Sequence, residues 1–360
     1  MKDSFFYPLK VSSKFPICNL PLRLDPYNRC SFNCKYCFSN NRSIGKRNTD
    51  SKPNIKWLRN KYRKVYDEKN INKTNFLEVL LSKRITLHCG GQSDPFPIYE
   101  KEYNYTKEIV ELSNEYNLNI LFSTKNCTYY NVPCNPSLHS FQLSITNTFN
   151  DKNIEENVPL FKNRLHFYHQ LKDEGYRVGI RLQPYIDEYT DFEKIIEYFN
   201  DADHFTIESL KLVPGGKYNN YLKKYFNYKD TDFTNMGLLN LKPYIRYKYY
   251  QKIIKILEDY GLSYSISDND LHYIGNNNCC CGDQLVKNTI PFANTRLLKK
   301  YGRNYTINNV FQEAQDYLNC KCSSLYTSSR RKNCRTVQDF YNKRFNQKKA
   351  IFNPKTNYYE

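Results

Sequence analysis

Three cysteines within eight residues constrain this chain more than any other feature. Cys30, Cys34 and Cys37 follow a C-x3-C-x2-C spacing and come shortly after the apolar-alternating stretch Leu20 to Leu24. Three thiolates at this spacing can hold a cubic iron–sulfur cluster, in which one iron then stays open to a small chelating molecule. Zinc also accepts closely spaced thiolates, but it needs a fourth Cys or His, and the next ones lie beyond a long basic segment.

The length of 360 residues suits a single α/β barrel of about 250 residues with an added piece. Short apolar runs alternate with longer helix-like segments, which predicts parallel βαβ units. The expected strands are Leu20–Asp25, Arg84–Cys89, Asn119–Ser123, Ser140–Thr146, Arg177–Gln183 and His204–Leu210. The expected helices are Glu100–Tyr116, Phe161–Glu174 and Phe192–Asn200.

The cysteine content indicates a reducing compartment. Thirteen is an odd count, and the vicinal run Cys279-Cys280-Cys281 favours metal over disulfides. No apolar run approaches the ~20 residues needed to cross a bilayer, and residues 1–21 lack the order of a secretory signal. We therefore expect a soluble, cytoplasmic protein without a membrane partner.

The net charge of +18 is concentrated in two segments. Residues 35–84 carry 14 Lys or Arg against 4 acidic residues, and residues 296–360 also carry 14 against 4, so each has a net charge of 14 − 4 = +10. Such segregation is typical of a polyanion-binding face, and Trp57, Tyr62 and Tyr66 add stacking groups among the cations. The alternative is a solvated lysine-rich surface. We expect contact with DNA or RNA through these segments.

The C-terminal third carries a second group of cysteines: Cys279, Cys280, Cys281, Cys320, Cys322 and Cys334. Four of these six residues could bind a second iron–sulfur cluster or a structural zinc ion, and their spacing does not decide between the two. Further upstream, Ser263 to Ser267 reads as another strand that leads into Asp268, Asp270 and His272. For Asp268, Asp270 and His272, a hydrated turn is a simpler interpretation than a role in acid–base chemistry.

The three-cysteine loop resembles that of the radical S-adenosylmethionine (radical SAM) enzymes, in which an aromatic residue, here Tyr36, precedes the last cysteine. The resemblance implies a partial (β/α)6 TIM-like barrel in residues 1–215, followed by a basic, cysteine-rich extension in residues 216–360 with the second metal site at 279–334. It also implies a [4Fe–4S] cluster that is reduced by an electron donor and binds S-adenosylmethionine. The cofactor is cleaved to a 5′-deoxyadenosyl radical, which takes a hydrogen atom from the substrate.

The resemblance also implies which strand ends surround the cofactor. Gly90, Gly91 and Gln92 follow the second strand, where relatives hold the methionyl amino group, although Gln92 stands where many have a glutamate. The other expected cofactor-binding residues, at the ends of the third to fifth strands, are Ser123, Lys125, Ser144, Thr146 and Arg181. Arg181 could pair with the cofactor's carboxylate.

The stretch Ser93-Asp94-Pro95-Phe96-Pro97-Ile98-Tyr99-Glu100 is similar to one in the spore photoproduct lyase-like branch, as are Glu155-Glu156, Arg164 and the run at 171–175. This likeness covers residues 20–215. It implies a lyase or modifying enzyme related to DNA repair. Cys89 is then the expected hydrogen-atom donor, and Tyr36 could relay a radical.

Two enzymatic hypotheses follow. The first is a radical SAM enzyme acting on a nucleic-acid base or lesion. The alternative is one that modifies a peptide or small metabolite with an auxiliary iron–sulfur cluster. A non-catalytic protein that keeps the cluster as a redox-sensitive element is a third interpretation. Salt-dependent nucleic-acid binding distinguishes the first from the second.

Overall fold

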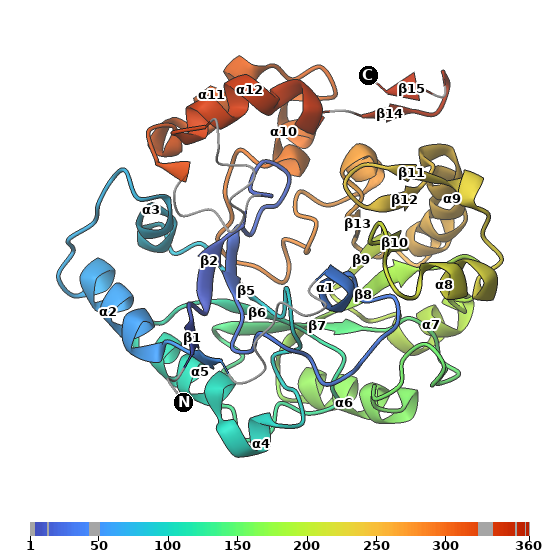
Figure 1. Cartoon of the computed structure of the whole chain (residues 1–360), viewed down its shortest axis with the longest axis horizontal. Helices are drawn as coiled ribbons and strands as arrows, with labels where there is room; N and C mark the ends of the chain where they lie inside the picture. Colours follow the sequence, from blue (N-terminus) through green and yellow to red (C-terminus); the bar gives the residue numbers. More distant parts are fainter. Residues whose placement is uncertain are drawn as a thin grey trace.

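A mixed α/β architecture surrounds one large sheet in the computed structural model of the chain (Figure 1), which describes residues 4–12, 14–42, 51–322, 334–349, 351–356 and 358–359. The parts of the two basic segments at residues 43–50 and 323–333 lie outside the described residues. Within the described residues, no helix is long and apolar enough to cross a membrane.

The sheet has eight strands, seven of them mutually parallel. β2, at one edge, is antiparallel to its neighbour β3. The strands in spatial order are β13 (Tyr264–Ile266), β9 (His204–Ser209), β8 (Arg177–Tyr185), β7 (His139–Ser144), β6 (Ile120–Thr124), β5 (Leu87–Cys89), β3 (Leu22–Leu24) and β2 (Leu9–Val11). Nearly every residue of β5, β6, β7 and β9 is buried, as expected of parallel strands covered on both faces.

The six strands predicted from the sequence correspond to β3 and β5–β9. The sheet continues beyond the predicted boundary at residue 215, because β13 pairs with β9 in register Tyr264↔Phe205. Residues 216–360 therefore contribute a strand to the main sheet, and that boundary does not coincide with a sheet edge.

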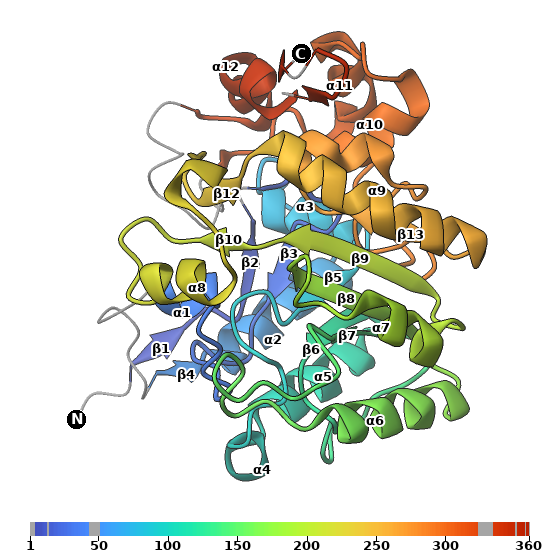
Figure 2. The same ribbon diagram turned by 90° about the vertical axis from the view of Figure 1, so that its right-hand side faces the viewer.

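Helices form a ring around the outside of the sheet (Figures 1 and 2). They are α2 (Ile55–Tyr66), α3 (Phe76–Ser82), α5 (Tyr105–Glu115), α6 (Phe161–Asp173), α7 (Phe192–Phe199) and α9 (Pro243–Asp259). In α7 the buried residues Phe192, Ile195, Ile196 and Phe199 recur at helical spacing and form one apolar face. We call the opposite side of the sheet, which carries Leu121 and Gln142, the inner face.

Smaller elements complete the chain. α1 (Phe38–Arg42) follows the cysteine loop, and α4 (Glu100–Tyr103) precedes α5. A small sheet consists of β10 (Lys211–Leu212), β12 (Leu239–Leu241) and β11 (Phe233–Asn235), in that order. α8 (Asn219–Tyr225) lies between β10 and β11 along the chain. α10 (Asn294–Tyr301), α11 (Ile307–Glu313) and α12 (Val337–Lys349) lie together at one end (Figure 2). The pairs β1 (Phe5–Phe6) with β4 (Lys52–Pro53) and β14 (Phe352–Asn353) with β15 (Tyr358–Tyr359) are short.

Candidate active site

The three-cysteine loop lies at the carboxyl-terminal edge of the parallel sheet, between β3 and α1. Cys34 is buried, and Cys30 and Cys37 are half-buried. All three pack in one apolar cluster with Phe32, Tyr36, Ile154, Val158, Ile186, Leu210, Leu212 and Leu222. This apolar shell keeps water from one side of the thiols, as a redox cluster requires.

The three sulfurs of the cysteine loop are less closely grouped than the ligands of a single bound ion. Within the described residues, Cys30, Cys34 and Cys37 do not form a group whose ligand atoms all lie within 4.8 Å of one another. A cube binds each thiolate through a different iron at a different corner, so it needs more widely spaced ligands than one ion does. Burial raises the pKa of the Cys30 thiol to about 12 and that of Cys34 well above its ordinary value, so metal ligation would have to displace their protons.

Hydrogen bonds connect the loop after β5 to the residues on either side of the three cysteines. Gly90 has a φ of +101°, and a Cβ there would stand 2.2 Å from the Ser123 carbonyl oxygen, so only glycine fits. The Gln92 amide donates to Asp25 Oδ1 at 2.9 Å, and Ser39 Oγ donates to the Gln92 carbonyl at 2.8 Å. The predicted residues Gly90, Gly91 and Gln92 therefore lie beside the cysteine loop.

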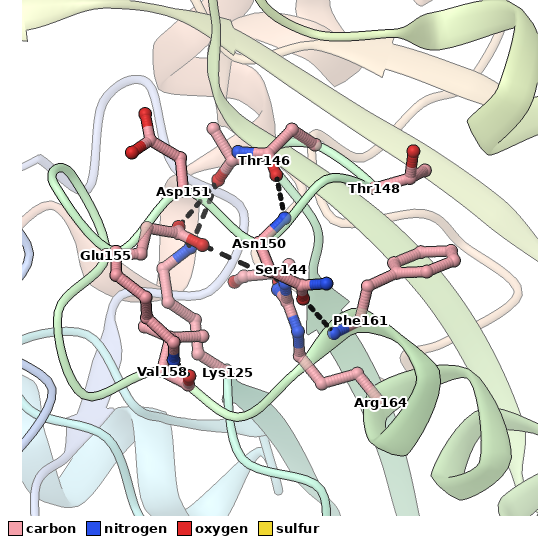
Figure 3. A network of polar contacts seen from close by, with 12 residues as sticks. Lys125, Ser144, Thr146, Thr148, Asn150, Asp151, Glu155, Val158, Phe161 and Arg164 are labelled. Carbon is pink, nitrogen blue, oxygen red and sulfur yellow. Dashed lines mark hydrogen bonds and ion pairs between the residues drawn. The ribbon is translucent and has the colours of Figure 1, made fainter.

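A buried carboxylate, Glu155, meets Lys125 and Thr146 at the ends of β6 and β7 (Figure 3), and it also accepts a hydrogen bond from Tyr36 of the cysteine loop. Lys125 Nζ donates to Glu155 Oε1 at 2.9 Å and to Thr146 Oγ1 at 3.3 Å. The Tyr36 hydroxyl donates to Glu155 and lies 3.1 Å from Thr146 Oγ1. Arg164 Nη2 stands 3.8 Å from Glu155 Oε2. Glu155 thus brings together three predicted site residues, Tyr36, Lys125 and Thr146. The sequence analysis mentioned Glu155 only as part of the likeness to the lyase-like branch and did not predict it as a site residue.

The charge of Glu155 is balanced within this network. Burial by itself would raise its pKa, but Lys125 and Arg164 outweigh burial and hold it at about 2. Lys125 is therefore already paired. The contacts support a role for it and for Tyr36 in positioning the cysteine loop.

A row of polar side chains crosses the inner face below this network. His88 Nε2 lies 2.8 Å from Ser123 Oγ, which donates to Gln142 Oε1 at 3.1 Å. Arg181 Nη1 donates to the same two oxygens at 3.2 and 3.3 Å. Ser144 is in register with Arg181 on the same face. The structure therefore brings the predicted residues Ser123, Ser144 and Arg181 to one surface.

Cys89 lies elsewhere. It is fully buried in the main hydrophobic core and in register with Phe122, which packs against Phe96 and Phe141 on the helix-covered face. The neighbouring His88 points to the inner face instead. Because strand side chains alternate between faces, the thiol of Cys89 is directed away from the predicted cofactor site, and a role as hydrogen-atom donor is not supported.

The six C-terminal cysteines do not form one group. Cys279, Cys280 and Cys281 share a small apolar cluster with Cys18, which precedes β3. Cys320, Cys322 and Cys334 belong to the main core instead, and Cys320 Sγ lies 3.6 Å from the Lys73 carbonyl oxygen near α3. The predicted six-cysteine constellation is therefore divided. Cys18 was missed because no spacing motif links it to residues about 260 positions later in the chain.

The aromatic residues of α2 belong to the core. Tyr62 is fully buried, and Trp57 packs against Tyr7 with ring centroids 4.8 Å apart. Lys61 and Lys64 both pair with the buried carboxylate of Glu78, at 2.8 and 2.9 Å. Tyr62 is therefore not available to stack on nucleic-acid bases, because it lies on the buried face of the amphipathic helix, whereas Trp57 and Tyr66 are half-buried at the edge of the core.

Asp268, Asp270 and His272 are buried, so a hydrated turn is also wrong for them. Arg246 binds Asp270 through two nitrogens at 2.8 and 2.7 Å, and Lys211 Nζ lies 2.9 Å from Asp268. These ion pairs join α9 and β10 to the segment after β13.

The chain combines a largely parallel sheet with a three-cysteine loop after the first parallel strand, and this fold is similar to that of solved enzyme structures. The solved structures that the chain resembles include spore photoproduct lyase complexed with dinucleoside spore photoproduct, with a TM-score of 0.50, 13% identity, and coverage of 71% of this chain and 80% of the lyase. A variant of that lyase with bound AdoMet and the same dinucleoside has a TM-score of 0.50 and 14% identity over the same shares. The predicted likeness to the lyase-like branch is thereby confirmed for the fold. No protein-family model and no curated protein matches the sequence.

Proposed function

We propose that this chain is a radical SAM enzyme built on a partial (β/α)6 barrel and acting on a nucleic-acid base or lesion. A [4Fe–4S] cluster at Cys30, Cys34 and Cys37 would supply the electron that cleaves S-adenosylmethionine and so generates the hydrogen-abstracting radical. Gly90 lets the loop after β5 lie against the Ser123 carbonyl, and Ser123, Ser144 and Arg181 offer polar contacts from the inner face. The Glu155 network holds Tyr36, and with it the loop, against the strand ends.

The observation that carries the choice of substrate is an aromatic and cationic patch attached to the cysteine loop. Lys35, between two of the cluster ligands, places Nζ 4.3 Å from the ring centroid of Tyr221 on α8. Tyr221 and Tyr225 stack at 5.6 Å with 27° between their planes, and both rings are partly open to solvent, at 38% and 42% exposure. Exposed stacked rings beside a lysine suit bases and phosphates of a single strand.

This α8 patch, Lys35 with Tyr221 and Tyr225, replaces the stacking residues expected on α2. It lies beside the cluster ligands, since Tyr218 and Phe226 of the same segment pack in the apolar cluster that holds the three cysteines. A strand bound here would lie close to the radical source. The alternative, a peptide or small-metabolite enzyme, would use this patch for an aromatic or anionic side chain.

The test measures cleavage and binding on the same preparation. The full chain is reconstituted anaerobically with iron and sulfide and reduced with dithionite, and 5′-deoxyadenosine is measured with and without single-stranded DNA or RNA. We expect release in wild type, stimulation by one polymer, and none from Cys34→Ala. Absence of release with iron bound would contradict the enzymatic proposal.

Binding to a fluorescent single strand tests the substrate class. Tyr221→Ala is expected to weaken binding by 1–3 kcal/mol, the usual contribution of one stacked base. Tyr260→Ala, at an exposed tyrosine (50%) after α9, is the matched control and should bind as wild type does. Affinity should also fall steeply between about 50 and 200 mM salt. Salt-independent binding, or equal loss in both variants, would favour the peptide or metabolite alternative.

A further inference from the structure

The chain between β13 and α10 crosses the inner face near the amino-terminal ends of the parallel strands. We call residues 276–290 the floor segment; it runs through the middle of the ring of helices, in orange (Figure 1). The carbonyls of its three consecutive cysteines each accept a hydrogen bond from a different strand. Ser265 donates to Cys279 at 2.8 Å, Thr206 to Cys280 at 3.1 Å, and Gln142 to Cys281 at 3.3 Å.

Two glycines allow this close seating. A Cβ on Gly282, which has a φ of +85°, would lie 2.5 Å from the His204 ring, and a Cβ on Gly179 of β8 would lie 2.6 Å from Leu285 Cδ1. The backbone of the cysteine run is therefore pinned to the sheet. Its thiols gather with Cys18 among Leu20, Leu121, Leu285 and Val286.

The three thiols of the run are unusually compact. Their sulfurs all lie within 4.8 Å of one another, and those of Cys280 and Cys281 are 4.0 Å apart. The Cys281 amide donates to Cys279 Sγ at 3.4 Å, the kind of contact that supports a bound thiolate. Zinc–sulfur bonds of about 2.3 Å in a tetrahedron place sulfurs about 3.8 Å apart. The spacing thus matches a single ion, whereas Cys30, Cys34 and Cys37 are not grouped in this way.

Cys18 supplies a fourth thiol from the other side. It is 6% exposed and shares the apolar cluster of the run, while its sulfur stands outside the compact group of three. Arg23 Nη2 donates to Cys18 Sγ at 3.2 Å, and Arg181 acts electrostatically on Cys281. A divalent ion with four thiolates carries two net negative charges, and these two guanidinium groups would balance them.

We propose that Cys18, Cys279, Cys280 and Cys281 bind one thiophilic divalent ion of the zinc type. The fourth ligand closes on the ion by a side-chain movement of Cys18. The ion ties the segment before β3, the strand that leads into the cluster loop, to the floor segment. Cys320, Cys322 and Cys334 take no part. The four ligands are separate from the three cysteines of the cluster loop.

The experiment uses the full chain with Cys30, Cys34 and Cys37 all changed to alanine, purified without added iron, so that the first loop cannot contribute metal. Zinc is measured per chain, and cobalt(II) is then exchanged in to record its thiolate charge-transfer and tetrahedral ligand-field absorption. We expect about one zinc per chain and the spectrum of a tetrathiolate. This variant lacks the three cysteines of the cluster loop and cannot cleave S-adenosylmethionine. Its zinc content therefore tests the metal site whether or not the proposed function is correct.

Single substitutions in that background assign the ligands. Cys281→Ser should lower bound zinc at least tenfold, and Cys18→Ser should weaken zinc retention against a chelator at least tenfold and shift the cobalt bands. Cys127→Ser, at a half-buried cysteine outside the cluster, and Cys322→Ser should retain zinc. If Cys281→Ser does not fold, the zinc retention and the cobalt bands of Cys18→Ser test the proposal instead. Absence of zinc, a disulfide in its place, an iron–sulfur spectrum, or zinc lost with Cys322 would each overturn the proposal.

Discussion

Replacing Glu155 by glutamine should cost about 3 kcal/mol of folding stability at neutral pH. Lys125 and Arg164 hold the pKa of this buried carboxyl at about 2 against an ordinary value of 4.5. Each pH unit of that difference is equivalent to about 1.36 kcal/mol, so the charged group stabilises the fold by 2.5 × 1.36 = 3.4, which is about 3 kcal/mol. The side chain is buried, so water screens these charge interactions only weakly. Glutamine keeps the shape but leaves the buried Arg164 and the half-buried Lys125 without this counter-charge.

The assay is urea denaturation of the metal-free chain. With a slope of about 3 kcal/mol per molar urea, the loss corresponds to a midpoint lower by about 1 M. Glu197→Gln, the same change at an exposed position of α7, should leave the midpoint unchanged. Lys125→Met combined with Glu155→Gln should be less damaging than the sum of the two single changes, by about 1 kcal/mol or more.

The pH dependence has a defined sign. Because the folded pKa is depressed, the contribution of Glu155 is fully present above pH 4.5 and is lost as the pH falls toward 2. The difference between wild type and Glu155→Gln should therefore shrink between pH 5 and pH 2.5. A difference below about 0.5 kcal/mol at pH 7, or one that is independent of pH in this window, would refute the reasoning.

Three further substitutions test the packing around the site. Gly90→Ala should destabilise the fold by about 2–5 kcal/mol, because the new side chain would take up a left-handed φ and clash with a backbone carbonyl. Gly215→Ala, where φ is +69° and the space is open, should cost only about 1–2 kcal/mol in the same urea denaturation. Arg246→Met removes the buried guanidinium that pairs with Asp270 and should cost about 3–5 kcal/mol, seen as a lower thermal midpoint; a change under about 1 kcal/mol would contradict the ion-pair account. Gly282→Ala should loosen the floor segment, so its amides should exchange hydrogen faster while those of α7 do not; unchanged exchange would show that this segment is not held by close packing.

Much of the fold could be read along the chain. The parallel strands β5–β9 are short apolar runs between amphipathic helices, a pattern set by local burial and therefore visible in sequence. The cysteine loop was equally accessible, because its three ligands lie within one turn-forming segment. β13 also appeared as a strand, but its place in the main sheet did not, since pairing with β9 depends on contacts across about 60 residues.

What the chain order could not reveal is which side chains meet. Cys89 and His88 are neighbours in sequence, yet the two-residue period of a strand directs them to opposite faces. Basic and aromatic residues on α2 look like a nucleic-acid surface until the helix is packed, when Tyr62 enters the core and Glu78 pairs with Lys61 and Lys64. Cys18 joins Cys279–Cys281 because a loop before β3 and the floor segment converge on the inner face. Local periodicity thus determined the elements, and long-range packing selected the partners of the site.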